Sequence, residues 1–179
     1  MQALGQSPLF MIRPGDETLD AALDGRGYRV NDPVVLYHAP VSTLTDKPLE
    51  LVTAFTTYPP LAITNDLWQE AGIGAGRRAV MERAKGPKTT ILARNKDQPA
   101  GAAFVAIYDS IAMIHAIEVP EAHRRQGVGA NILRAAAHWA QDNGATDLTL
   151  AVTRANTGAN ALYTSKGMTV VGNYHYRIK

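Results

Sequence analysis

The chain has 179 residues, of which 46% are hydrophobic and 19% charged, a balance typical of one full globular domain with room for part of another. It contains no cysteine, which excludes disulfides, zinc–thiolate sites and a cysteine nucleophile. The net charge of +2 is too small to indicate a nucleic-acid partner, and His38, His123, His138 and His175 are too scattered to indicate a bound metal.

The first ten residues have neither the basic start nor the long apolar run of a secretory signal. No apolar run elsewhere reaches the roughly 20 residues that span a bilayer. Together with the lack of cysteine, these features predict a cytoplasmic location and no membrane partner.

Residues 9–36 have the pattern of a strand, a helix and a strand, and the polar, proline-bearing stretch 39–48 is typical of a linker. We therefore expect a partial unit over residues 1–47 and an α/β domain over residues 48–179. A partial sheet has an unpaired edge, which we expect to pair within the chain or across a homodimer.

The sequence pattern of the partial unit recurs later in the chain. When 140 is added to each number, Asp16 falls on Asn156 and Gly27 on Gly167 without a gap. Asp and Asn both favour the N-cap of a helix, and glycine at a helix exit supplies the left-handed conformation. Either two strand–helix–strand stretches resemble each other by coincidence, or the chain holds a partial internal repeat, the front of whose first copy is missing from this chain.

Residues 48–179 alternate between strand-length apolar runs and helical patterns. A strand over 50–56 is followed by helical patterns over 61–71 and 75–84, joined by a glycine-rich stretch. We then expect strands over 88–95, 100–108, 111–119, 147–153, 168–171 and 174–178, and helices over 130–142 and 156–166. This order predicts an α/β fold with a mixed, twisted central sheet flanked by helices.

Arginines and glycines meet between the strand 111–119 and the helix 130–142. A helix start exposes free backbone N–H groups, glycine lets the backbone approach an anion, and arginine adds charge. Arg124, Gly127 and Gly129 therefore predict a phosphate site. Ala130 breaks the Walker pattern and Ile132 the dinucleotide fingerprint, which leaves the motif R-x-x-G-x-G.

This motif resembles that of the GNAT superfamily of acetyl-coenzyme A-dependent N-acyltransferases, and two neighbouring motifs agree. Ile117-Glu118-Val119 resembles the family's L-x-V strand end, and Asn156-x-x-Ala159-x-x-Leu162-Tyr163-x-x-x-Gly167-Met168 resembles its N-x-x-A-x-x-L-Y-x-x-x-G-F. The resemblance covers residues 50–179. It implies the GNAT acyl-CoA N-acyltransferase fold, with acetyl-coenzyme A as cosubstrate and no metal, and it makes the N-terminal unit a degenerate, partial GNAT-like copy.

The resemblance also implies which residues hold the coenzyme. In the family, the splayed strand end pairs with the pantetheine arm, and the loop and helix start hold the pyrophosphate by backbone amides. The residues expected to bind the coenzyme are therefore Ile117, Val119, Arg124, Arg125, Gln126, Gly127, Val128, Gly129, Ala130 and Asn156.

Direct transfer to an amine needs a base for the ammonium proton and an acid for the leaving thiolate. Tyr163 stands where the family has a tyrosine that points at the coenzyme sulfur and acts as the acid; the alternative is a core tyrosine whose hydroxyl bonds elsewhere. His115 stands where the arylalkylamine branch has a catalytic histidine, although Met113 replaces that branch's second histidine; the alternative is a hydrogen-bonded structural histidine.

Strand alternation places His115, Ile117 and Val119 on one face and Glu118 on the other. Glu118 is the rival base, acting through water, and the alternative for it is a salt-bridged surface carboxylate. Tyr58 and Trp68 lie near Pro59-Pro60 and can shape an acceptor pocket, or belong to turn and core.

We expect the chain to transfer an acetyl or related acyl group to the primary amine of a small molecule or peptide, through a ternary complex. Two other functions stay open: a non-catalytic coenzyme A-binding sensor or partner-binding module of the same fold, and a nucleotide-binding protein that uses the arginine–glycine loop. No motif names the acceptor, and fold resemblance does not determine a substrate.

Overall fold

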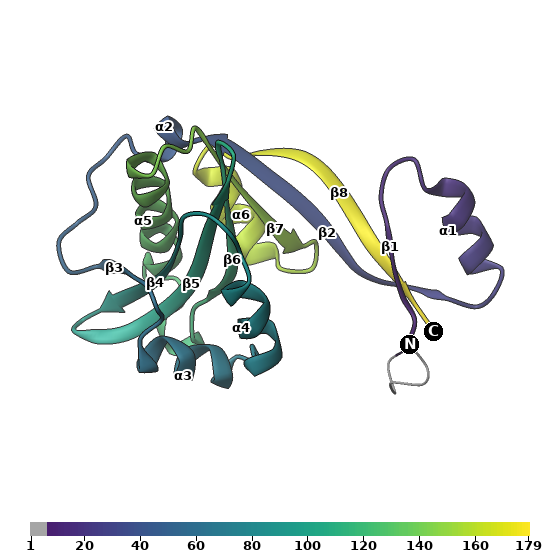
Figure 1. The fold of residues 1–179 in the computed structure, drawn as a ribbon, viewed down its shortest axis with the longest axis horizontal. Coiled ribbons are helices and arrows are strands. Elements are labelled where there is room, and N and C mark those ends of the chain that lie inside the picture. The colour runs from purple at the N-terminus through teal and green to yellow at the C-terminus, as the bar shows by residue number, and fades with distance from the viewer. Residues whose placement is uncertain (1–6) are drawn as a thin grey trace.

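The computed structural model describes residues 7–179, which form an eight-stranded mixed sheet with helices packed on its faces (Figure 1). The strand order is β1-β8-β2-β7-β6-β5-β4-β3. The strands are β1 (Leu9–Ile12), β2 (Arg29–Pro40), β3 (Ala54–Thr57), β4 (Lys88–Asn95), β5 (Gln98–Tyr108), β6 (Ile111–Glu118), β7 (Asp147–Thr153) and β8 (Thr169–Ile178). The helices are α1 (Glu17–Asp24), α2 (Val41–Leu44), α3 (Ala62–Glu70), α4 (Ala75–Glu82), α5 (Val128–Asp142) and α6 (Thr157–Ser165). The mixed α/β fold predicted from the sequence is confirmed.

Strands β3 to β6 pair antiparallel with one another in chain order, and α5 then crosses over so that β7 pairs with β6 in parallel. Only the first halves of these parallel strands pair, from Ile111 opposite Asp147 to Ile114 opposite Leu150. Beyond that point β6 runs on to Glu118 and β7 to Thr153 without pairing to each other. The sheet therefore opens between its two parallel strands, as the sequence predicted.

Two apolar clusters cover the two faces of the sheet. The larger lies under α5 and α6 and includes Ile132, Leu133 and Tyr163, and the smaller lies under α3 and α4 and includes Leu67, Trp68 and Phe104. The apolar stripe of α5 fits the first cluster because its small alanines let the helix pack closely on the sheet. None of the helices in residues 7–179 is long and apolar enough to cross a membrane.

Strands β2 and β8 run antiparallel past each other and extend into the arm seen at the right of Figure 1, where α1 and β1 lie. The first residues of β2 pair with the end of β8, and the later ones pair with the start of β8 and with β7. The offset of 140 residues relates these elements, since α1 begins at Glu17 and α6 at Thr157, and β2 begins at Arg29 and β8 at Thr169. Gly27 and Gly167 both have positive φ, at 77° and 79°.

Three expectations about elements are wrong. The stretch 39–48 is not a linker throughout, because Ala39 and Pro40 complete β2 and α2 buries Val41 and Leu44. The two strands expected at the C-terminal end are one strand, β8. Strand β2 pairs with nearly the whole length of β8, and two shifts of register accommodate the irregular pairing between them. Helix α5 begins at Val128, two residues earlier than expected.

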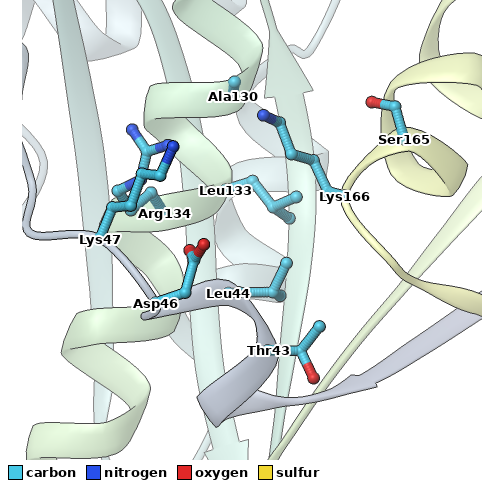
Figure 2. Close-up of a pocket in the computed structure, with 9 residues that line it drawn as sticks. All are labelled: Thr43, Leu44, Asp46, Lys47, Ala130, Leu133, Arg134, Ser165 and Lys166. Carbon is cyan, nitrogen blue, oxygen red and sulfur yellow. The ribbon is translucent and has the colours of Figure 1, made fainter.

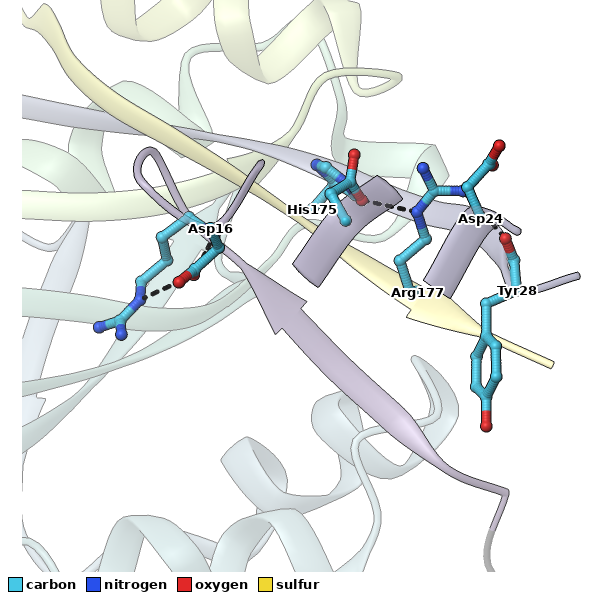
Figure 3. Close-up of polar contacts among 7 residues, drawn as sticks. Asp16, Asp24, Tyr28, His175 and Arg177 are labelled. Carbon is cyan, nitrogen blue, oxygen red and sulfur yellow. Dashed lines mark hydrogen bonds and ion pairs between the residues drawn. The ribbon is translucent and has the colours of Figure 1, made fainter. Parts of the chain in front are cut away.

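Arg177 lies on β8 and joins the elements of the arm by hydrogen bonds (Figure 3). Its side chain is 8% exposed, and it donates to Asp20 Oδ1 at 2.7 Å, to Asp24 Oδ1 at 2.6 Å and to the carbonyl of Tyr28 at 2.9 Å. His175 also contacts Asp20, with 2.9 Å between Nε2 and Oδ1. Because Asp20 and Asp24 lie on α1, these contacts hold that helix against the sheet.

Candidate active site

Strand β6 has a β-bulge just beyond the point where its pairing with β7 ends. Phe104 of β5 pairs with His115, but Ala102 pairs with Glu118, so β6 holds one extra residue between them. Ala116 takes a positive φ of 50° in the bulge, and the indole Nε1 of Trp68 donates to its carbonyl at 2.9 Å. Gly101 makes room opposite, because a Cβ there would lie 2.8 Å from the carbonyl oxygen of Glu118.

The bulge overturns the strand faces expected from simple alternation. Directly paired residues of antiparallel strands point to the same face, so His115 and Glu118 share the face of Phe104 and Ala102, toward α3 and α4. Ile117 and Val119 instead pack against the cluster under α5. The expectation that His115 lies with Ile117 and opposite Glu118 is therefore wrong, because the extra residue reverses the alternation.

His115 lies beside Phe104, with 6.4 Å between the two ring centroids, and one side of the residue is exposed. Partial burial of the imidazole lowers its pKa below 6.5, and the positive charge of Arg77 on α4 lowers the pKa further. No hydrogen bond joins the ring to any other group in residues 7–179, so the structural-histidine alternative lacks its expected partner. Both effects favour the neutral imidazole, the form that can accept a proton.

Glu118 is engaged by Arg124. Arg124 Nη2 lies 3.7 Å from Glu118 Oε1, and Arg124 Nε donates to the carbonyl of Val119 at 2.9 Å. Arg124 therefore lies across the end of β6 rather than over the glycines that follow it. The contact matches the salt-bridged alternative for Glu118.

The loop before α5 presents a row of backbone donors. Within the part of the chain that the structure describes, the N–H groups of residues 125–130 donate to no acceptor. Gly127 is the N-cap residue with a φ of 83°, and Arg125 also has a positive φ, at 61°. Free donors at the positive end of a 15-residue helix are typical of an anion site.

Other side chains hold this loop in place. Gln126 accepts from Asn95 Nδ2 at 2.7 Å and donates to the carbonyl of Ala122 at 2.8 Å. Val128 is buried, and a Cβ on Gly129 would lie 3.0 Å from Leu162 Cδ2, which lets α5 and α6 pack closely. Ala130 follows on the first turn of α5.

Tyr163 is 5% exposed and lies against Tyr37, with 5.5 Å between ring centroids. Tyr37 pairs with Leu150, the last residue of β7 that pairs with β6, so Tyr163 packs close to the point where the two strands part. Burial raises the pKa of Tyr163 to about 12, and its hydroxyl forms no hydrogen bond with any group in residues 7–179. Asn156 caps α6 as expected, accepting from the N–H of Ala159 at 3.1 Å.

A cavity of about 200 Å³ lies on the His115 face, lined by both Tyr58 and Trp68 together with Phe104. The sequence suggested the first two residues as pocket walls. It missed Phe104, because nothing in the sequence distinguishes this residue from other strand residues. It also missed Arg77, because an arginine at this position is equally expected on a solvent-exposed helix face. The small residues Ala100-Gly101-Ala102-Ala103 were a usable signal, because glycine inside a strand often marks a bulge or a close approach of another backbone.

Comparisons with known proteins agree with this geometry. Residues 51–168 match the model of the Acetyltransferase (GNAT) family. The uncharacterized N-acetyltransferase YobR of Bacillus subtilis (strain 168) is 32% identical over 104 residues, which cover 58% of this chain and 42% of YobR. The chain therefore spans less than half the length of that relative.

Solved structures share the fold at low sequence identity. A GCN5-related N-acetyltransferase from Kribbella flavida superposes with a TM-score of 0.67 at 20% identity, covering 99% of this chain and 70% of that one. A functionally unknown conserved protein from Staphylococcus epidermidis ATCC 12228 gives a TM-score of 0.68 at 18% identity, covering 92% and 67%. A tandem GNAT protein from the clavulanic acid biosynthesis pathway gives 0.65 at 14% identity, covering 93% and 58%.

Proposed function

Since the chain belongs to the GNAT acetyltransferase family, we propose that it transfers an acetyl group from acetyl-coenzyme A directly to the primary amine of a small molecule or peptide. Acetyl-coenzyme A is the usual cosubstrate of this family, and its enzymes act on amine acceptors. The observation that carries the proposal is the row of free N–H groups at residues 125–130, beside the opening between β6 and β7.

The coenzyme fits this arrangement in two parts. The pyrophosphate takes the free N–H groups around Gly127 and Gly129, where the helix dipole favours an anion. The pantetheine arm lies in the opening as an added strand, between residues 117–119 at the end of β6 and the end of β7 near Asn156. Arg124 now bonds to the Val119 carbonyl, so the arm must displace that contact or pass beside it.

The chemistry follows from groups that reach the opening from opposite faces of the sheet. His115 takes a proton from the acceptor ammonium, because a neutral imidazole with a lowered pKa is available as a base. The amine nitrogen then attacks the thioester carbon, the carbon–sulfur bond breaks, and the Tyr163 hydroxyl gives its proton to the thiolate. The second proton that the nitrogen loses as the neutral amide forms returns to the Tyr163 phenolate. Glu118 shares the His115 face but is held by Arg124, which favours His115 as the base.

The cavity lined by Tyr58, Trp68 and Phe104 is the proposed acceptor pocket, since it lies on the face of the base. Its walls combine these three aromatic residues with polar ones, among them the charged Arg78 and Glu82. Fold similarity adds nothing about the acceptor's identity. We also propose that residues 48–179 form the catalytic unit and residues 1–47 the remnant of a second copy.

Calorimetric titration with acetyl-coenzyme A and with desulfo-coenzyme A tests the proposal. We expect micromolar binding of both, followed by release of free thiol when a panel of primary amines is added. Binding without turnover on any amine would favour the sensor or partner-binding module. Absence of binding to either compound would contradict the placement of the coenzyme.

A further inference from the structure

Two cavities with charged linings lie on opposite faces of the sheet. The cavity of about 170 Å³ that Figure 2 shows lies beside α5 and shares Ala130 with the row of free N–H groups, so it belongs to the coenzyme side of the site already described. The proposed acceptor pocket, of about 200 Å³, lies on the other face, where α3 and α4 pack. Its lining includes one cation and one carboxylate, Arg78 and Glu82, and both belong to α4. The acceptor pocket therefore offers a substrate one charge of each sign.

Arg78 is anchored through one nitrogen and keeps unused donors on the others. Its Nη1 donates to Gln69 Oε1 and to the carbonyl of Ile73, each at 3.2 Å. Its Nε and Nη2 donate to no group in residues 7–179, and the residue is half-buried. A guanidinium presents five N–H donors in a fixed fork, which matches the two oxygens of a carboxylate. The anchored fork therefore suits an acceptor that carries a carboxylate.

Glu82 lies one helical turn after Arg78, a spacing at which an arginine and a glutamate of one helix ordinarily pair. No ion pair among residues 7–179 includes either side chain, and the Glu82 carboxylate accepts no hydrogen bond from them. The nearby ammonium of Lys88 donates instead to the backbone carbonyls of Glu82 and Ala84, at 2.5 and 2.9 Å. Within the described chain, the pocket thus holds two opposite charges about 6 Å apart along the helix axis, neither of which is paired.

Aromatic walls connect the pocket to the proposed base. Trp68 and Phe104 both line the pocket. The indole of Trp68 bonds to the carbonyl of Ala116, next to His115, and the Phe104 and His115 ring centroids lie 6.4 Å apart. His115 itself is not among the lining residues. An acceptor whose charged end lies in the pocket must therefore reach past these rings to bring a nitrogen to His115, and an apolar spacer suits that path.

We propose that the acceptor is a diamino acid, a small molecule with an α-ammonium and an α-carboxylate at one end and a second primary amine at the other. Arg78 binds the carboxylate, Glu82 binds the α-ammonium, and the aromatic walls contact the methylene groups between the two ends. The α-amine is not the reacting nitrogen, because a single carbon joins it to the carboxylate that Arg78 holds. This inference rests on the proposed function, because it brings the second amine to His115.

The transfer is the one described above, with the second amine as nucleophile. The acetyl group passes from the coenzyme sulfur to this nitrogen, whose two protons go to His115 and to the Tyr163 phenolate. The coenzyme leaves as the free thiol, and the α-ammonium and the carboxylate stay unchanged. The product is therefore an amino acid that is acetylated on its side-chain nitrogen.

The first test compares acceptors by the release of free thiol from acetyl-coenzyme A. Diamino acids of increasing length, from 2,3-diaminopropionate to ornithine and lysine, identify the chain length that fits. The best of them is then compared with the ω-amino acid and the diamine of the same length, which lack the α-amine and the carboxylate respectively. We expect kcat/KM to fall about tenfold without the carboxylate and about threefold without the α-amine, because Arg78 is half-buried and Glu82 is exposed.

Variants of the two residues separate recognition from damage to the fold. Arg78→Gln should lower kcat/KM for the diamino acid about tenfold more than for the diamine, and Glu82→Gln about threefold more than for the ω-amino acid. A merely structural role would lower the values for all acceptors alike. Arg83→Gln and Glu70→Gln remove exposed charges of the same kinds outside the pocket lining and should leave all three values unchanged.

Several results would overturn the proposal. Acetylation of the α-nitrogen, identified by mass spectrometry of the product, would contradict the placement of the second amine. Equal kcat/KM for the diamino acid and either analogue would show that the missing group is not recognised. Turnover of other primary amines but of no diamino acid would contradict this inference and leave the proposed function in place. Coenzyme binding without turnover on any amine would contradict both.

Discussion

Arg77 and His115 come from different elements, and the structure couples them through charge. Arg77 lies on α4 and His115 on β6, and the arginine lowers the histidine's pKa in addition to the effect of burial. A general base is useful only in its unprotonated form, so a lowered pKa extends activity to lower pH. At the scale of residues, one side chain that is far away in the sequence thus lowers the pKa of the proposed base.

Arg77→Gln should raise the pKa of His115, because it removes a positive charge that opposes protonation. The acidic limb of kcat/KM against pH, expected below pH 6.5 in the wild-type protein, should then move to higher pH. His115→Gln should abolish the limb and lower turnover. Arg83→Gln, on the exposed end of the same helix, is the control and should leave the limb in place. A limb that Arg77→Gln does not move would assign it to another group.

Tyr163→Phe should lower kcat by about 100-fold, the lower range for losing a general acid. The phenol is protonated throughout the working pH range, because burial raises its pKa to about 12. Phenylalanine keeps the packing against Tyr37, so coenzyme affinity should be nearly unchanged in calorimetry. Tyr37→Phe is the matched control, since that hydroxyl donates to Asn160 Oδ1. Unchanged turnover in Tyr163→Phe would remove this residue from the mechanism.

The hydrogen-bond donors at the start of α5 belong to the element as a whole, because they are backbone N–H groups that no single side chain supplies. Gly127 takes a φ of 83°, and Gly129 lets α6 approach. The adjoining bulge of β6 is a second such element, built from Gly101, Ala116 and the Trp68 indole. Together these two backbone features form the edge of the opening.

Gly127→Glu should weaken coenzyme binding by at least about 100-fold, because it places a negative charge beside the proposed pyrophosphate position. Gly127→Ala adds a side chain without a charge, so it separates the effect of charge on binding from the effect of backbone strain. A Cβ at this position meets no atom within 4 Å, so alanine should cost only about 1–2 kcal/mol of stability from the left-handed backbone. Coenzyme affinity measured by calorimetry should survive the alanine variant. Retained affinity in Gly127→Glu would mean that the loop does not face the phosphates.

At the scale of the whole molecule, the arm depends on a few polar contacts. Arg177 joins β8 to two carboxylates of α1, and β2 and β8 connect the main sheet to the arm (Figure 1). The hydrogen bonds from Arg177 and then His175 lower the pKa of Asp20 from 3.8 to about 2. A carboxylate with a lowered pKa stabilises the folded state above its unfolded pKa.

Asp20→Asn should therefore weaken the arm at neutral pH and make it less sensitive to acid. In the wild-type protein, the contribution of Asp20 is complete above about pH 4 and is lost as the pH falls toward 2. Hydrogen exchange should show faster exchange of the amides in α1 and β1 in the variant, with those of β4 and β5 unchanged. Asp16→Asn is the control, because Asp16 contacts Arg13 rather than β8. Equal exchange in Asp20→Asn and wild type would show that these contacts do not hold α1.

The outer edge of β1 is the expected contact of a homodimer. Among residues 7–179, only its inner edge is paired, to β8, and Leu9 and Met11 are 44% and 46% exposed. An open, apolar strand edge favours pairing with another chain. Light scattering should give the mass of a dimer for the wild-type protein and of a monomer for Leu9→Lys with Met11→Lys. Val80→Lys changes an exposed valine on α4 and should remain dimeric; a monomeric wild-type protein would contradict the dimer.

The sequence by itself determined the elements and motifs that depend on local spacing. The helix periodicity of α5, the glycine-bearing loop before it and the cap at Asn156 are all properties of residues close together in the chain. Alternation predicted β6 as a strand for the same reason. These features predicted the fold and the proposed coenzyme site, with its loop motif and Tyr163.

Only the tertiary structure decided which faces and partners these residues have. The bulge that brings His115 and Glu118 to one face depends on Gly101 of another strand and on Trp68 of α3. The lowered pKa of His115 depends on its partial burial and on Arg77 of α4. The passage of β2 between β7 and β8 likewise follows from long-range pairing. Such contacts join distant segments, and no local pattern of spacing records them.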